Sequence, residues 1–542
     1  LILEEPALGT SDPRSVKWRR PPDPQTLARF RILIVGAGLS GLGMAIKLQE
    51  AGLAFEIVEK NETVGGTWFE NGYPGCGVDT PNHFFSYSFE PNHDWPEHFS
   101  KRDELWAYVE RCADKYDLRR HIRFKTEMTS ARYDGESALW HVTLRTADGR
   151  EETRTVDALI TAVGQLNRPA IPDIPGLAAF QGPAFHTGHW DHGQSVAGKR
   201  VAMIGTGASG MQTGPSIAPD VAHLTVFQRT PHWAVANPNY HAKVNDGKKW
   251  ALKNIPFYAN WYRFQLFWAS SDGLHASLQI DPEWTTPDIS LNAQNQKFRE
   301  TLIAHMTKEL DGDPELLSKV VPPYPPYGKR MLRDNHWYKM LKRPNVALVT
   351  EPIEKISAHA IHTRDGQSHP VDMIILASGF QAGRMLWPME IRGATGQTLR
   401  EIWGDDDPRA HLGITVPDFP NLFMLYGPNT NLGHGGSAIF HSECQIRYIM
   451  LALREMLDVP PVEQLDLDLG MQLPQLPQLA VLAGHQRLLH GRHLDVQILL
   501  GEVEIRREGT GDATVDVALE VQHAEEIERI DRCAGLLDLR PG

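Results

Sequence analysis

Short apolar runs, each followed by glycine, recur along the chain and predict buried parallel strands. Residues 32–35 (ILIV) and 200–204 (RVAMI) have the length and composition of such strands, and each is followed by a glycine-rich turn and a helix-length segment. Two longer runs, 157–164 (DALITAVG) and 372–379 (DMIILASG), each place a glycine seven residues after an aspartate. The alternation of strands and helices predicts an α/β fold, and the repeated run predicts two crossings of the chain between the same pair of domains.

The turn after the first strand fits a dinucleotide-binding site. Gly36, Gly38 and Gly41 have the spacing GxGxxG, in which the glycines permit a tight turn, close approach of a pyrophosphate, and packing of the helix on the strand. The helix predicted over 39–51 points its free N–H groups and positive dipole end at that phosphate. A second strand ends at Glu59, 23 residues after Gly36, where a carboxylate can accept hydrogen bonds from ribose hydroxyls. We predict that this Rossmann-like site binds FAD.

A second copy of the pattern predicts a second nucleotide. Gly205, Gly207 and Gly210 repeat the glycine spacing, and the next strand leads to Gln228 and Arg229 where the first site has its glutamate. The change removes a carboxylate that would repel a ribose 2'-phosphate and supplies a guanidinium that can bind it. These residues predict NADPH; the alternative is an arginine that is simply exposed at a strand end.

Aromatic residues concentrate in the segment 236–324, which interrupts the second nucleotide-binding domain. Its stretch WALKNIPFYANWYRFQLFW is too aromatic for a solvated loop and predicts helices. These helices either cover the cleft between the nucleotide domains or bury their aromatic side chains in a core of their own. The stiff turn 322–328 (PPYPPYG) is followed by Lys329, Arg330 and Arg333, which can reach anionic cofactors from there.

Length and charge narrow the class of protein. With 542 residues the chain is too long for one hydrophobic core, so roughly two to four domains are expected. A formal net charge of −13 argues against nucleic-acid binding and against an anionic membrane surface, because both favour basic patches. No apolar run approaches the length of a membrane span, and no signal-like segment opens the chain, so a soluble, cytoplasmic protein is expected.

Cysteine and histidine spacing gives no sign of a metal or a disulfide. The four cysteines lie far apart and form no CxxC pair, so neither a disulfide framework nor a zinc site is predicted. A flavin disulfide reductase, which needs a close cysteine pair, is disfavoured for the same reason. His186, His189 and His192 have ligand-like spacing, but nothing completes a metal site, and we predict none.

Two longer motifs resemble the signatures of one enzyme family. In FQGPAFHTGHWD, the residues Phe180, Gly182, His186, Trp190 and Asp191 match the pattern FxGxxxHxxxW(P/D) of type I Baeyer-Villiger monooxygenases. The stretch GGTWFENGYPGCGVD, which ends at Asp79, resembles a second signature of that family. The resemblance covers residues 28 to 455, and within the family the chain looks closest to the 4-hydroxyacetophenone (aryl ketone) group.

The resemblance implies a mechanism. NADPH reduces bound FAD, O2 adds at C4a of the flavin, and the peroxide attacks an aryl or cyclic ketone, which becomes an ester or lactone. Arg330 matches the family's active-site arginine, which would stabilise the peroxide and then the oxyanion, and Asp79 matches the acid that orients this arginine. Arg333 is the rival for the role of Arg330, because the sequence does not tell which side chain points into the cleft.

The resemblance also implies binding and linker residues. Lys329, Arg229 and Thr230 match positions that hold the NADP phosphate, and His186 and Trp190 match residues that couple domain movement to the catalytic cycle. The loop 427–436 (GPNTNLGHGG) resembles the last FAD-contacting turn and the substrate loop. The remaining expected cofactor contacts are Gly66, Thr67, Trp68, Tyr73, Thr206 and Ser209.

These assignments give expected domain boundaries. The Pro-rich residues 1–30 are expected to form an extended arm on the surface, and the 94 residues after Tyr448 contain no Phe, Trp or Tyr, which marks an atypical tail. The expected parts are an FAD domain (31–165 and 365–460), an NADP domain (170–235 and 325–364), a helical insertion (236–324) and the tail (461–542).

Two other functions stay open at this point. Flavin-containing monooxygenases that oxygenate nitrogen or sulfur share both nucleotide sites but lack the tryptophan and acid seen at Trp190 and Asp191. A flavin-binding protein made inactive by its tail would oxidise NADPH without forming ester. The particular ketone and the oligomeric state also stay open.

Overall fold

Two parallel sheets form the centre of the described chain. The computed structural model describes residues 17–18, 22–431 and 433–458, so the expected tail 461–542 lies outside the described residues. Each sheet has five strands among these residues, in the orders β19-β7-β1-β2-β3 and β13-β10-β9-β17-β8. The two Rossmann-like sheets expected from the apolar runs and glycines are therefore confirmed.

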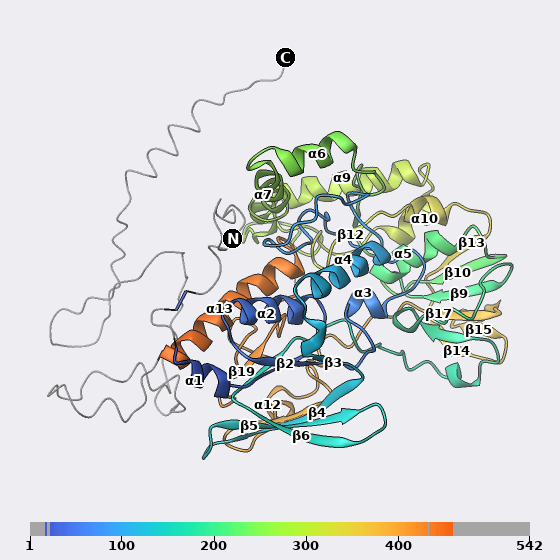
Figure 1. The fold of residues 1–542 in the computed structure, drawn as a ribbon. Coiled ribbons are helices and arrows are strands. Elements are labelled where there is room, and N and C mark those ends of the chain that lie inside the picture. The colour runs from blue at the N-terminus through green and yellow to red at the C-terminus, as the bar shows by residue number, and fades with distance from the viewer. Residues whose placement is uncertain (1–16, 19–21, 432, 459–542) are drawn as a thin grey trace. The chain divides into compact units, whose positions relative to one another are not determined.

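The first sheet separates two hydrophobic cores, because neighbouring residues of a strand point to opposite faces. Ile32 and Ile34 of β1 pack with the helices, whereas Leu33 and Val35 pack with an antiparallel sheet. Figure 1 shows helices α2, α4 and α13 over one face and strands β4 to β6 beyond the other. The elements are β1 (Ile32–Val35), α2 (Leu39–Glu50), β2 (Phe55–Val58), α3 (Thr67–Glu70), α4 (Arg102–Lys115), β3 (Ile122–Arg123), β4 (Thr126–Asp134), β5 (Leu139–Thr146), β6 (Glu151–Val156), β7 (Ala158–Thr161), β18 (Glu390–Arg392), α12 (Leu399–Trp403), β19 (Leu422–Met424) and α13 (Ala438–Asp458).

The second sheet repeats this arrangement. Val201 and Met203 of β9 pack with helices α5 and α11, whereas Ala202 and Ile204 pack against a small antiparallel sheet. The elements are β8 (Ala184–His186), β9 (Arg200–Ile204), α5 (Ala208–Ile217), β10 (His223–Phe227), β11 (Ala234–Val235), β12 (Leu332–Arg333), α11 (Trp337–Leu341), β13 (Val346–Val349), β14 (Ile353–Ile356), β15 (Ala360–Thr363), β16 (Ser368–Pro370) and β17 (Met373–Leu376).

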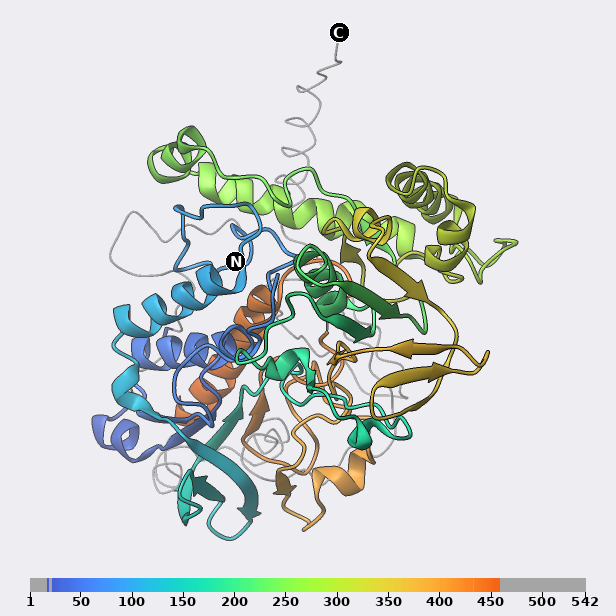
Figure 2. The ribbon, with the colours of Figure 1, turned by 90° about the vertical axis from the view of Figure 1, so that its right-hand side faces the viewer.

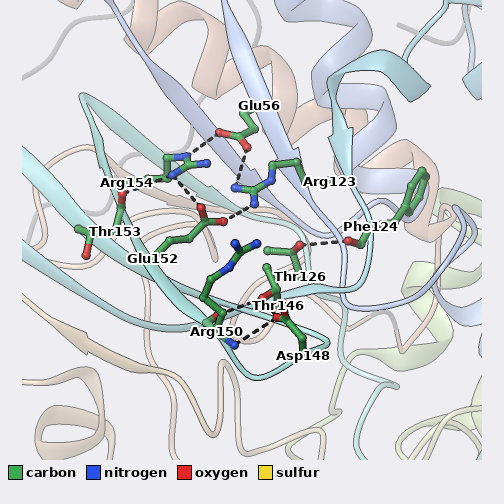
Figure 3. Close-up of polar contacts among 10 residues, drawn as sticks. All are labelled: Glu56, Arg123, Phe124, Thr126, Thr146, Asp148, Arg150, Glu152, Thr153 and Arg154. Carbon is green, nitrogen blue, oxygen red and sulfur yellow. Dashed lines mark hydrogen bonds and ion pairs between the residues drawn. The ribbon is translucent and has the colours of Figure 1, made fainter.

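A ring of alternating charges joins the first sheet to the antiparallel sheet behind it. Figure 3 shows Glu56 of β2, Arg123 beside it on β3, and Glu152 and Arg154 on β6. Arg123 lies 3.5 Å from Glu56, Arg154 lies 3.4 Å from Glu56 and 3.3 Å from Glu152, and Arg123 also pairs with Glu152. All four side chains are partly exposed, so each pair contributes about 1 kcal/mol or less to stability.

The structure differs from two of the expectations, one about the sheet to which a strand belongs and one about the conformation of the arm. Residues 365–460 were assigned to the first domain, but β17 is hydrogen-bonded between β9 and β8 in the second sheet, since its four apolar residues are all buried there. The arm 1–30 was expected to be extended, but Pro24–Arg29 forms the short helix α1. Asp23 caps this helix by accepting the N–H of Thr26, and proline is well tolerated in its first turn.

The segment 236–324 is largely helical, as expected, and part of it packs against the rest of the chain. Figure 2 shows its helices, in green to yellow-green, along one edge of the described chain. Phe267 lies 5.9 Å from Phe84 and 5.5 Å from Phe440 of α13, between ring centroids, so these aromatic side chains do not only build a core of their own. The helices are α6 (Asp246–Asn254), α7 (Tyr258–Ser270), α8 (Asp272–His275), α9 (Ala293–Glu309) and α10 (Pro314–Val320). Among the described residues, no helix combines the length and hydrophobicity that crossing a bilayer requires.

Candidate functional site

A cavity of about 570 Å³ lies where the carboxyl ends of the two sheets meet. Both glycine-rich turns contribute to its walls, as do α13 and the end of α7 at Ser270. The predicted site residues that line it are Gly36, Gly38, Glu59, Gly66, Thr67, Trp68, Tyr73, Asp79, Gly207, Ser209 and Arg330. In open α/β sheets, ligands bind at this end of the strands.

The first glycine turn has the geometry that a dinucleotide requires. Gly36 has φ +107°, and a Cβ there would stand 2.6 Å from the carbonyl oxygen of Ala162. A Cβ on Gly41 would stand 2.0 Å from the carbonyl oxygen of Gly36, so only glycine lets α2 pack this closely. Gly38 caps α2 without a side-chain hydrogen bond, which leaves the first N–H groups of the helix for a ligand. These residues fit the pyrophosphate of FAD.

Glu59 lies at the end of β2 as expected and is almost completely buried. Its Oε2 accepts the N–H of Ala37 at 2.7 Å, and its Oε1 accepts the N–H of Asn61 at 2.9 Å. Burial raises the pKa of Glu59, and these two backbone N–H groups oppose that shift. A carboxylate has further lone pairs, so Glu59 can still accept hydrogen bonds from ribose hydroxyls in the cavity that it lines.

The loop that follows α3 connects the first turn to the second domain. Trp68 packs edge-on against Phe85 at 5.6 Å between ring centroids and forms part of the cavity wall. The hydroxyl of Tyr73 donates to Oε1 of Gln212 on α5 at 2.9 Å. A Cβ on Gly75 would stand 2.4 Å from the backbone oxygen of Gln212, so this loop packs directly on α5.

The second glycine turn repeats the geometry of the first. Gly205 has φ +111°, and a Cβ there would stand 2.3 Å from the carbonyl oxygen of Ala377. A Cβ on Gly210 would stand 2.5 Å from the carbonyl oxygen of Gly205. In the part of the chain that the structure describes, no heavy atom would lie within 4 Å of a Cβ on Gly207, so the space beside this glycine is open to a ligand. This open cradle at the uncapped start of α5 fits the second dinucleotide.

The residues after β10 differ from Glu59 in their surroundings. Gln228 is buried, and its Nε2 donates to the backbone oxygen of Lys319 on α10 at 2.7 Å. Arg229 and Lys329 are exposed, and Lys329 lies 5.1 Å from the ring of Tyr324. The backbone oxygen of Thr230 accepts the hydroxyl of Thr206 at 3.3 Å. None of these five predicted residues lines the cavity of about 570 Å³.

Asp79 and two arginines form the charged part of the cavity. Arg330 and Arg333 both line it, on the chain that returns from the helical insertion. The Nε of Arg333 donates to the backbone oxygen of Asp79 at 3.2 Å, whereas Arg330 makes no hydrogen bond to a described residue. Burial raises the pKa of Asp79, and the two arginines oppose this shift, Arg330 more strongly than Arg333. Both arginines therefore stay candidates for contact with the reacting atoms, and Arg330 has the freer guanidinium.

The motif 180–191 lies at the junction of the two domains and does not line the cavity. Trp190 packs against the cores of both domains, which suits a linker residue. His186 accepts the N–H of Gly188 at its Nδ1, and burial lowers its pKa to about 4, so it is neutral at physiological pH. Phe180 is buried in the second domain. A Cβ on Gly182 would stand 2.4 Å from the backbone oxygen of Asp372, so this position is closely packed. Asp191 accepts the N–H of Gly193 at 2.9 Å.

Sequence reasoning missed Gln212 and Tyr240. The Nε2 of Gln212 lies 3.4 Å from Oδ1 of Asp79, and the hydroxyl of Tyr240 lies 3.1 Å from the same oxygen. The first residue is in the second glycine pattern and the second is in the insertion, so only the folded chain brings them to Asp79. Among the described residues, no group of His, Cys, Asp and Glu side chains could hold a metal ion.

Two nucleotide-binding turns that face one cavity define an oxidoreductase using a flavin and a nicotinamide dinucleotide. Residues 29–242 match the family model of flavin-binding monooxygenase-like proteins. The chain is 44% identical over 436 residues to the uncharacterised monooxygenase y4iD of Sinorhizobium fredii. The matched region covers 80% of this chain and 66% of that protein. It is 37% identical over 445 residues to a Baeyer-Villiger monooxygenase of Pseudomonas aeruginosa, covering 82% and 80% of the two chains.

The fold agrees with these relatives. The crystal structure of cyclohexanone monooxygenase from Rhodococcus sp. Phi1 bound to NADP+ matches with a TM-score of 0.65 and 31% identity, over 78% of this chain and 84% of that chain. The chain belongs to the flavin-binding monooxygenase-like family and, within it, to the Baeyer-Villiger monooxygenases. It is an FAD- and NADPH-dependent enzyme of the kind that converts ketones to esters or lactones.

Proposed function

We propose that this enzyme oxygenates cyclic or aryl ketones, with Arg330 as the catalytic arginine and Asp79 as the acid that orients it. The observation that carries the proposal is the position of Arg330, beside the partly buried Asp79, in the wall of a cavity that both nucleotide turns reach. When bound, FAD supplies the oxygenating chemistry and NADPH the reducing equivalents. The protein has to hold these groups, orient the ketone and stabilise negative charge.

The charged residues of the cavity are suited to stabilising negative charge. A guanidinium keeps its proton at any physiological pH and offers several N–H donors, so Arg330 can hold an anionic oxygen during the reaction. Asp79 lies in the same wall, and its attraction to Arg330 and Arg333 keeps the guanidinium groups near the cavity. The same residues would favour a ketone whose carbonyl oxygen gains negative charge over an uncharged amine or sulfide.

Aromatic side chains support the proposed substrate class. Tyr327, Phe380, Trp387 and Tyr426 lie in the cavity wall and offer flat surfaces to a ring. Cyclohexanone monooxygenase, a solved relative, carries a cyclic ketone in its name. The proposed likeness to the 4-hydroxyacetophenone group extends the expected substrates to aryl ketones. We propose Arg229 and Lys329 as the residues that select NADPH, since both are exposed basic residues of the second domain.

A substrate panel tests the proposal. The purified enzyme is incubated with NADPH, O2 and one of four compounds: cyclohexanone, 4-hydroxyacetophenone, a linear ketone or a thioether. Gas chromatography then measures ester, lactone and sulfoxide, while absorbance follows NADPH. We expect the first two compounds to give the most ester or lactone per NADPH. Sulfoxide as the main product would support the sulfur-oxygenating alternative, and NADPH oxidation that yields only hydrogen peroxide would support an inactive flavin-binding protein.

A further inference from the structure

Asp79 is a meeting point of three segments that are far apart in the sequence. Its Oδ1 accepts hydrogen bonds from Nε2 of Gln212 on α5, at 3.4 Å, and from the hydroxyl of Tyr240 near the start of the helical insertion, at 3.1 Å. Its backbone oxygen accepts the Nε of Arg333, at 3.2 Å. The acid is therefore held by the nucleotide-binding helix of the second domain, by the insertion and by the segment that carries the catalytic arginine.

Gln212 is bonded entirely across the domain junction. The residue is 4% exposed, and its Nε2 donates both to Asp79 and to the backbone oxygen of Gly77, the latter at 2.9 Å. Its Oε1 accepts the hydroxyl of Tyr73 at 2.9 Å. The amide belongs to the second domain, and all three of these partners belong to the first. A buried amide with this many partners has a defined position, because losing any of them would leave a polar group unsatisfied.

We propose that Gln212 is a positioning residue that holds Asp79 in place for Arg330 and Arg333 and links this charged group to the nicotinamide-binding helix, with Tyr240 as the second holder. The proposal rests on the function proposed above for Asp79 and Arg330. Gln212 and Tyr240 act through Asp79 and are not themselves catalytic residues.

The link has a structural basis in α5. This helix begins at the open cradle beside Gly207, and Gln212 lies about one and a half turns further along the same rigid element. Where Gly75 packs on the helix, a Cβ would stand 2.2 Å from Oγ of Ser216 and 2.4 Å from the backbone oxygen of Gln212. A shift of α5 when the nucleotide binds must therefore move either the loop of Asp79 or the hydrogen bonds that Gln212 makes to it.

The surroundings of Asp79 determine how its charge responds to a change at Gln212. The groups that face it are Arg330 and Arg333 after the insertion, Tyr240, Gln212, and Tyr73 and Cys76 of its own loop. Burial raises the pKa of Asp79, while the arginines and the two hydrogen-bond donors oppose that shift. Removing the Gln212 donor takes away one of the interactions that lower the pKa of Asp79. The pKa therefore rises further, and the acid takes up its proton at a higher pH.

The test replaces Gln212 with leucine, which keeps the bulk and removes the donor, and with glutamate, which adds a like charge. The matched control is Thr213→Val, at the next residue of α5, because Thr213 is fully buried and its hydroxyl has no partner among the described residues. The protonation of Asp79 is followed by the carboxylic C=O band in infrared difference spectra as the pH is lowered. The band is assigned by its absence in Asp79→Asn.

We expect this band to appear at a higher pH in Gln212→Leu than in the parent, and at a higher pH still in Gln212→Glu. Ester formed per NADPH at neutral pH should fall on the order of tenfold in Gln212→Leu, as for one lost hydrogen bond to a charged group. The acid limb of the pH profile should move the same way as the band. Flavin content and the rate at which NADPH reduces the flavin should stay near parent values, and Thr213→Val should match the parent throughout.

Two outcomes separate this inference from the function on which it rests. If Asp79→Asn keeps the parent ratio of ester to NADPH, the proposed role of Asp79 fails. If Asp79→Asn abolishes ester formation but Gln212→Leu changes neither the infrared band nor the pH profile, only the positioning role of Gln212 is wrong. Should Gln212→Leu not fold, Tyr240→Phe removes the other donor while keeping the ring packed on Phe99, and it must move the band in the same direction.

Discussion

The two parallel sheets repeat the same construction down to single hydrogen bonds. Asp157 and Asp372, which begin the runs DALITAVG and DMIILASG, accept the backbone N–H groups of Arg31 and Arg200 at 2.8 and 2.9 Å. In each run the carbonyl oxygen of the alanine that follows the strand, Ala162 or Ala377, blocks any side chain at the first glycine of the neighbouring turn. The repeated run is therefore part of each nucleotide-binding turn, and it also marks where the chain leaves that sheet.

The sheets differ at the residue that follows the second strand. Glu59 turns back to its own glycine turn and accepts the N–H of Ala37, whereas Gln228 turns away and donates to Lys319 of the helical insertion. The same position of the fold therefore holds a cavity-lining residue in one sheet and a residue that bonds to a neighbouring helix in the other. What occupies the space beyond the strand decides between them, and in the second domain α10 occupies it.

The largest expected effects come from adding a methyl group at the third glycine of each turn, because each change should disable only one of the two nucleotide sites. Gly41→Ala should give protein without bound flavin, because the added Cβ would stand 2.0 Å from the carbonyl oxygen of Gly36. Gly210→Ala should give yellow protein that NADPH does not reduce, because the same clash, at 2.5 Å from the oxygen of Gly205, falls in the other domain. Flavin absorbance and anaerobic reduction by NADPH measure the two losses. The control is Gly135→Ala, where a Cβ would meet nothing within 4 Å.

The variant Gly207→Ala separates packing from ligand contact. A Cβ at Gly207 meets no heavy atom of the described residues within 4 Å, so the variant should melt at the parent temperature. Weaker NADPH binding by this variant would then result from contact between the added methyl group and the bound nucleotide. If Gly207→Ala binds NADPH like the parent, the open cradle is not where the nucleotide lies.

The next largest effect concerns the arginines that reach the cavity from outside both sheets. Arg330→Ala should lower the rate of ester formation by about a hundred- to a thousandfold, or about 2.7 to 4 kcal/mol, because a preorganised donor to a developing oxyanion is lost. Arg333→Ala should cost less, because the Nε of Arg333 is already bonded to the backbone of Asp79. Single-turnover measurements of flavin reduction and of ester formation separate the two steps. Ester formation near the parent rate in Arg330→Ala, but not in Arg333→Ala, would assign the catalytic role to Arg333.

A smaller effect tests how the second sheet selects its nucleotide. Arg229→Ala should reduce the preference for NADPH over NADH by about ten- to a hundredfold, since a charged hydrogen bond to the 2'-phosphate is worth about 1.5 to 3 kcal/mol. The ratio of kcat/KM for the two cofactors measures this preference. Arg364→Ala, another exposed arginine of the same domain, is the control. Unchanged selectivity in Arg229→Ala would leave Arg229 as an arginine that is merely exposed at a strand end.

Local patterns predicted the sheets, but contacts between distant segments could not be predicted. The strand 32–35 and the turn at Gly36 are marked by an apolar run and by glycine spacing, so the sequence was sufficient to identify them. The place of β17 in the second sheet was missed, since an apolar run does not specify its partner strand. The contact of Gln212 with Asp79 was missed for a similar reason, because 133 residues separate the two side chains and only tertiary packing brings them together.

The smallest expected effects come from exchanging the two residues that distinguish the sheets. Glu59→Gln places an amide N–H2 against the backbone N–H of either Ala37 or Asn61, so one donor loses its acceptor. Such a loss costs about 1 to 3 kcal/mol, and it should appear as weaker retention of FAD and a lower melting temperature. Gln228→Glu sets a carboxylate against the backbone oxygen of Lys319 and should cost stability in the same range.

The two exchanges should differ in their effect on ligands. Gln228→Glu should lower the melting temperature by a few degrees, at about 2 to 4 °C per kcal/mol for a domain of this kind, and leave the NADPH preference unchanged, because its side chain faces α10. Calorimetry and the kcat/KM ratio for the two cofactors, measured on the same preparation, check this expectation. A variant Gln228→Glu that melts with the parent but loses its preference for NADPH would mean that Gln228 faces the nucleotide after all. The two sheets would then be alike at this position as well.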